Sequence, residues 1–84
     1  MTLNELFKQT NETVDGITKT NLEGAILGLH ESATKIWQGS INDQKDIINT
    51  RAANALISVF QVFKKLGIEN PEECLVSRLN ELKK

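Results

Sequence analysis

The sequence has few of the residues that mark strands, long loops and cross-links. It contains no tyrosine, one proline and one cysteine among 84 residues. The lone Cys74 excludes a disulfide within the chain, which favours a reducing cytoplasmic location. The net charge is −1, so the chain lacks the broad basic face that binds nucleic acid or an anionic membrane. No apolar run approaches the roughly 20 residues that span a bilayer. We therefore expect neither nucleic acid nor a membrane as a partner.

The length predicts a single domain, residues 1–84. A chain of this size hides only about 60–65% of the surface that its unfolded form exposes, so its own core supplies a thin margin of stability. Small domains without a disulfide or a structural metal often gain stability by pairing with other subunits. The sequence therefore favours an assembly of identical chains.

One long stretch, residues 43–66, dominates the hydrophobic pattern. Its apolar residues recur every three or four positions, which is the period of a helix. Asp46 near its start and Lys64 and Lys65 near its end suit the two ends of a helix dipole. Three further residues widen the apolar stripe beyond what one neighbouring helix covers: Ala53, Ile57 and Phe60. We expect these three to form an oligomer interface, in which the long central helix pairs the chain with itself as a dimer or tetramer.

Helix-capping patterns delimit the other elements. Thr2 and Glu5 form a capping box, and Asn70 followed by Pro71 is typical of a helix start. Gly39 is expected to end the second helix, and Ser40 or Asp43 to cap the third. The fold class is then all-α, an antiparallel four-helix bundle-like domain. The expected helices cover residues 3–17, 21–38, 43–66 and 71–83.

Two polar strips are the candidate functional groups. One follows the second helix and the other follows the central helix. If they face each other, they form a polar groove with one or two carboxylates in it, as in bundle proteins that bind metals between helices. The alternative is two solvated helix faces with no ligand. The candidate groove residues are Glu23, His30, Glu31, Thr34, Arg51 and Asn54.

Four segments follow one another in an informative order. Residues 29–34 read LHESAT, residues 39–46 form a link, residues 51–56 read RAANAL, and a Leu-Gly-Ile turn at 66–68 leads to two glutamates. This order resembles the MazG-type nucleotide pyrophosphohydrolases and, more distantly, phosphoribosyl-ATP pyrophosphatase. Those all-α enzymes have Glu-Glu-x-x-Glu in the first segment and Glu-x-x-Asp in the third. The resemblance covers residues 22–84 and implies nucleotide phosphates held through Mg²⁺.

The acidic residues of that family are largely replaced here. Glu31 remains as the single candidate Mg²⁺ ligand, while His30, Thr34, Arg51 and Asn54 stand where the resemblance implies carboxylates. Mg²⁺ prefers hard oxygen ligands, and one carboxylate makes a weak site. We therefore expect the metal-dependent hydrolysis of nucleoside triphosphates to be lost or altered. Arg51 could still bind a nucleotide or another small anion.

Three functions remain open. The first is a helical homo-oligomer of this lineage with lost or altered pyrophosphohydrolase activity. The second is an active Mg²⁺-dependent NTP or dNTP pyrophosphohydrolase, whose carboxylate site is rebuilt from Glu23, Glu31, Asp43 or Asp46 or from another subunit. The third is a helical protein–protein interaction module that binds no nucleotide.

Overall fold

The computed structural model describes residues 1–84 as four helices joined by short links. The helices are α1 (Leu3–Ile17), α2 (Leu22–Ile41), α3 (Lys45–Lys65) and α4 (Pro71–Leu82). The expected all-α class is confirmed, and no residue lies in a strand. None of the four helices has the combination of length and apolar character needed to cross a bilayer.

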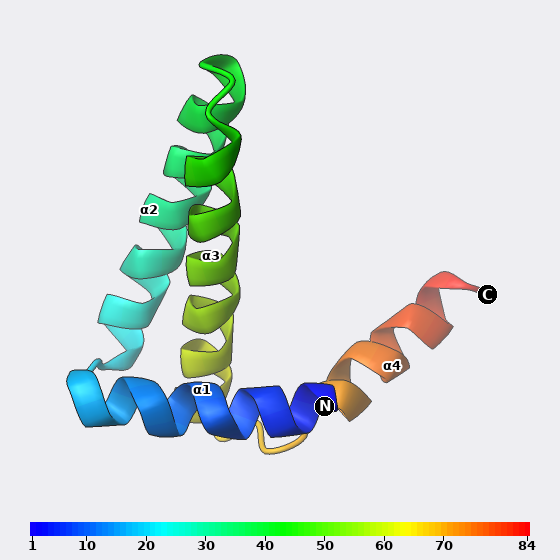
Figure 1. Cartoon of the computed structure of the whole chain (residues 1–84). Helices are drawn as coiled ribbons and strands as arrows, with labels where there is room; N and C mark the ends of the chain where they lie inside the picture. The colour runs from blue at the N-terminus through cyan, green and yellow to red at the C-terminus, as the bar shows by residue number, and fades with distance from the viewer.

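The helices do not line up as a closed antiparallel bundle within the single chain. As Figure 1 shows, α2 and α3 run side by side as a hairpin, α1 crosses the lower end of that pair, and α4 leads away from it. The Cα radius of gyration is 14.1 Å, against about 12 Å for a compact domain of this length. The single chain is therefore an open, angular molecule.

Caps account for three of the helix starts. The Thr2 side chain accepts a hydrogen bond from the Glu5 backbone N–H, as the capping pattern predicted. Asn70 caps α4 in the same way, with Pro71 in its first turn. At α2 the cap is Asn21, whose side chain accepts from the N–H of Gly24. At the other end of α3, Gly67 adopts a φ of 80° and terminates the helix as expected.

The junction between α2 and α3 differs from the prediction. Gly39 does not end α2, which continues to Ile41, and neither Ser40 nor Asp43 caps α3, which begins after Gln44 without a side-chain cap. Gly39 is buried because α3 passes close to it. A Cβ atom there would lie 2.9 Å from Cγ1 of Ile48. Its lack of a side chain serves helix packing rather than a turn.

Small residues form the contact between α2 and α3. Ala25, Ser32 and Gly39 are the buried residues of α2, and Ser58 is the buried residue of α3. A Cβ atom on Gly28 would lie 3.3 Å from the Ser58 hydroxyl oxygen. Such residues let two helix axes approach closely, because little side-chain volume separates them. Several larger residues of α2, Trp37 among them, stay exposed.

The chain leaves much apolar surface in contact with water. Ala25 and Pro71 have its only buried apolar side chains, and fourteen large hydrophobic residues are exposed. The accessible surface is 6282 Å², about 1,300 Å² more than is typical of a monomer of this mass. The single chain therefore leaves many of its large hydrophobic side chains in contact with water.

Candidate functional site: an apolar groove between α1, α3 and α4

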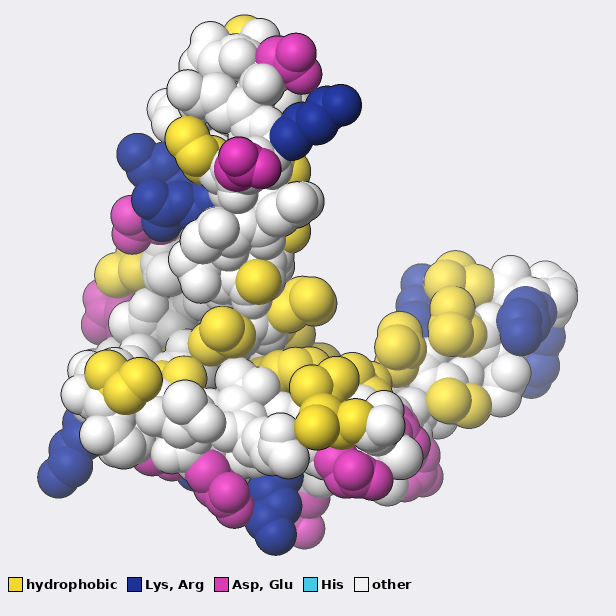
Figure 2. Space-filling model, in the orientation of Figure 1, with side chains coloured by type: hydrophobic (Ala, Val, Ile, Leu, Met, Phe, Trp, Pro, Cys, Tyr) yellow, Lys and Arg dark blue, Asp and Glu magenta, His cyan; other side chains and the backbone are white.

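The largest apolar hollow lies where α1, α3 and the base of α4 meet. Its volume is about 470 Å³. Figure 2 shows hydrophobic side chains gathered over this region, across part of α1, the lower half of α3 and one side of α4. None of the lining residues carries a charge. They are Leu3, Leu6, Thr10, Ala53, Leu56, Ile57, Val59, Phe60, Phe63, Pro71 and Leu75.

Helical periodicity brings these residues together. On α3 the lining positions recur at spacings of three and four from Ala53 to Phe63, which places them along one stripe. On α1 they are Leu3, Leu6 and Thr10, again one face of the helix. The three residues expected at an oligomer interface, Ala53, Ile57 and Phe60, all line this groove. Their role as an interface stays a prediction.

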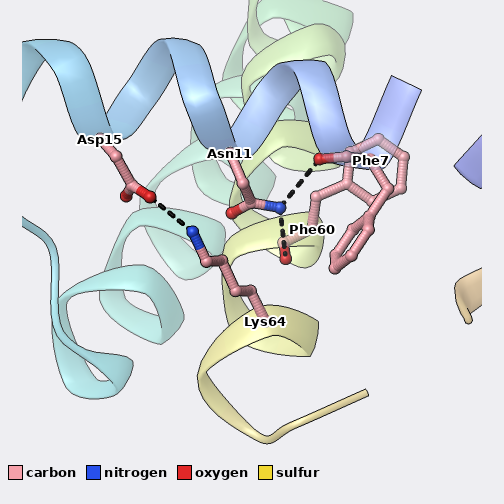
Figure 3. Close-up of polar contacts among 5 residues, drawn as sticks. All are labelled: Phe7, Asn11, Asp15, Phe60 and Lys64. Carbon is pink, nitrogen blue, oxygen red and sulfur yellow. Dashed lines mark hydrogen bonds and ion pairs between the residues drawn. The ribbon is translucent and has the colours of Figure 1, made fainter. Parts of the chain in front are cut away.

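Contacts between α1 and α3 hold these two helices together beside the groove (Figure 3). The rings of Phe7 and Phe60 meet edge to face, with centroids 5.8 Å apart. The buried amide of Asn11 donates to the carbonyl oxygens of Phe7 at 3.0 Å and Phe60 at 3.4 Å. An ion pair joins Lys64 Nζ to Asp15 Oδ2 at 2.5 Å. The hydrogen bond from Lys64 holds the pKa of the Asp15 carboxyl below its ordinary value.

A second set of hydrogen bonds holds the base of α4 against the start of α1. The Asn4 side chain donates to Asn70 Oδ1 at 2.9 Å and accepts from the Glu72 N–H at 3.2 Å. The Asn4 N–H donates to Glu72 Oε1 at 3.1 Å, where the carboxylate lies at the positive end of the α1 dipole. Pro71 beside them is fully buried. The direction in which α4 leaves the body is therefore fixed at its first turn.

The six residues of the expected polar groove are divided between α2 and α3. The α2 candidates Glu23, His30, Glu31 and Thr34 are all exposed, and Thr34 donates its hydroxyl to the carbonyl of His30 in its own helix. Arg51 and Asn54 on α3 are half-buried and line a separate polar hollow. No hydrogen bond or ion pair joins the two strips, and a groove shared by these six residues stays a prediction.

The metal-ligand chemistry expected at Glu31 has no supporting cluster. No group of three or more His, Cys, Asp or Glu side chains is placed to hold a metal ion. Glu31 is an exposed, isolated carboxylate on α2. Mg²⁺ sites that rely on one or two carboxylates need further oxygen ligands from substrate or water. Within one chain, the residues present do not fit a Mg²⁺ site of the kind that the family resemblance implies.

Sequence reasoning missed the residues that position the groove rather than those that line it. Asn4 and Asn11 connect α1 to α4 and to α3, yet neither stands out in the sequence, because each contacts residues more than 45 positions away. Leu75 lies at the end of the groove, and no local signal in the sequence indicates that place. Comparisons of the chain with protein-family models, curated proteins and solved structures find no match.

Proposed function

We propose that this chain is a self-assembling helical protein whose subunits associate through the groove between α1, α3 and α4. The observation that carries the proposal is the uncharged, eleven-residue lining of that groove. The chain also leaves fourteen large hydrophobic residues exposed, and extended apolar surface of this kind marks interaction sites in soluble proteins. The proposal joins two expectations from the sequence, a homo-oligomer and an interface at Ala53, Ile57 and Phe60.

The accessible surface area of the single chain supports association, in addition to the apolar lining of the groove. It exceeds the typical monomer value by about 1,300 Å². A specific protein–protein interface of standard size buries about 800 Å² on each partner. One interface of that size would therefore remove most of the excess. The antiparallel bundle that one chain does not form would then be completed by helices from another chain.

Concentration-dependent thermal unfolding tests the proposal. Dimerisation stabilises the folded state by mass action, so the Tm of the wild type should rise with chain concentration. Ala53→Glu places a charge in the groove and should abolish this dependence. Ala33→Glu makes the same change at an exposed alanine on α2 and should preserve it. A wild-type Tm that is independent of concentration, together with a monomeric mass, would overturn the proposal.

A second candidate function is binding of a small anion beside Arg51. The supporting observation is a polar hollow of about 470 Å³ lined by Asp46, Ile47, Thr50, Arg51 and Asn54. Arg51 supplies a permanent positive charge there, and Asn54 and Thr50 supply hydrogen-bonding groups. The Asp46 carboxylate in the same lining opposes an anion. Binding of a small anion there requires the positive charge of Arg51 to outweigh the negative charge of Asp46.

A nucleotide screen separates the remaining possibilities. Thermal shift is read with ATP or dATP, with and without Mg²⁺, on the wild type and on Arg51→Gln. Stabilisation of the wild type that is lost in Arg51→Gln supports the anion site. If no nucleotide stabilises the wild type, the anion site is excluded. Pyrophosphate release under the same conditions would restore the active-enzyme hypothesis, with the missing carboxylates contributed by another subunit. Glu31→Gln should then abolish turnover.

A further inference from the structure

We infer that the groove of each subunit is filled by α4 of a second copy, in a reciprocal exchange of arms across a two-fold axis. This inference rests on the proposed self-assembly and names the segment that performs it. It starts from α4, which extends from the body as an arm (Figure 1). Its four large apolar residues are between 44% and 63% exposed: Leu75, Val76, Leu79 and Leu82.

The α4 arm has the pattern of a helix that binds in a groove. Leu75, Leu79 and Leu82 stand at relative positions 0, 4 and 7, which match anchor positions of an amphipathic helix that binds in a hydrophobic groove, and Val76 follows Leu75 in sequence. From Leu75 to Leu82 these anchors cover about 10 Å of helix, and the α3 wall of the groove covers about 15 Å from Ala53 to Phe63. The arm is thus short enough to lie along the groove.

The arm does not fill its own groove. Its first turn is held by the Asn4 hydrogen bonds to Asn70 and Glu72 and by the buried Pro71. This attachment directs the remaining turns of α4 away from α3, so that Figure 2 shows apolar side chains on both sides of an open angle. Folding the arm back would break these contacts. A second copy can supply α4 without breaking them.

Symmetry makes the arrangement self-complementary. Pro71 and Leu75 at the base of the arm also line the end of the groove, so the two apolar surfaces are continuous. When a two-fold axis relates two copies, the surface that donates an arm also accepts one, which is the pattern of an isologous interface. The arrangement closes on itself and leaves no unpaired groove.

Two variants test the exchange by complementation. Leu79→Asp disables the arm and Leu56→Lys disables the groove, and each is an exposed position on its helix. In a reciprocal dimer either variant alone loses both contacts, and we expect its association to weaken at least about 30-fold. A mixture of the two regains one intact arm–groove contact and pairs Asp with Lys at the other. Native mass spectrometry should show the mixed dimer associating at least about tenfold more tightly than either variant alone.

The control is Ser77→Asp, which adds the same charge to another face of α4 and should associate like the wild type. Circular dichroism checks that every variant stays helical. If Leu79→Asp dimerises normally while Leu56→Lys does not, or if each is monomeric and the mixture does not associate, the exchange is overturned and groove-mediated assembly stands. If the wild type is monomeric, or neither variant affects its dimer, both proposals fail.

Discussion

Truncating one groove leucine should weaken self-association without weakening the subunit. Leu56 lies on α3, lines the groove and is 61% exposed in the single chain. Its side chain therefore contributes little to the folded monomer. Because alanine is the better helix former, Leu56→Ala should leave the helical content of the monomer unchanged or slightly raised.

The expected change in the dissociation constant follows from the fraction of the Leu56 side chain that the single chain leaves exposed. Full burial of a leucine side chain contributes about 1.5–3 kcal/mol, and the exposed 61% corresponds to about 1–2 kcal/mol. A symmetric dimer contains the residue twice, so the loss is about 2–4 kcal/mol. At about 1.4 kcal/mol for each factor of ten, the dissociation constant should rise about 30- to 700-fold.

The matched control is Leu27→Ala on α2. Leu27 is 59% exposed, lies within a helix and does not line the groove. Dissociation constants are measured by sedimentation equilibrium over a dilution series with reductant present, because exposed Cys74 could otherwise cross-link copies. Leu27→Ala should match the wild type. Equal dissociation constants for the wild type and Leu56→Ala would refute the reasoning, as would equal weakening by the two variants.

Three further predictions concern the elements that shape the groove. Asn4→Ala removes two side-chain hydrogen bonds that hold α4 and should lower the free energy of unfolding by about 1–3 kcal/mol, measured by urea denaturation; an unchanged value would mean that the arm is not held there. Gly39→Ala should cost about 1–3 kcal/mol because its Cβ would lie 2.9 Å from Ile48, whereas Gly16→Ala, with nothing within 4 Å, should gain about 0.5–1 kcal/mol. A gain at both glycines would contradict the close approach of α2 and α3. The lowered pKa of Asp15 means that its ion pair stabilises the fold fully above pH 3.8 and loses this effect as pH falls through the lower folded value. The Tm difference between wild type and Asp15→Asn should therefore be constant near neutral pH and disappear in acid, and a difference that persists in acid would count against the ion pair.

Local signals in the sequence were sufficient to predict where the helices lie along the chain, but not how the helices pack against one another. Thr2, Asn70 and Gly67 each act through neighbours within a few residues, so their roles as helix boundaries could be recognised. Gly39 was misjudged because a glycine in a turn and a glycine beneath another helix look alike in sequence. Only the approach of Ile48 distinguishes them.

The candidate site illustrates the same limit. The apolar stripe through Ala53, Ile57 and Phe60 was visible as a helix face too wide for one neighbour, and these residues line the groove. The polar groove was inferred from two strips that need not face each other. The α2 contact uses Ala25, Gly28 and Ser32 instead, because small residues permit the closest approach, and this leaves His30 and Glu31 in solvent.

The most direct test of the account is the mass of the wild-type chain in solution. Sedimentation velocity across a hundredfold range of concentration reports whether the species is the 9.4 kDa chain or a multiple of it. The account predicts a dimer or a larger even assembly that dissociates on dilution, with a frictional ratio lower than the open single chain would give. A monomer at every concentration, with the groove between α1, α3 and α4 exposed to water, would contradict it.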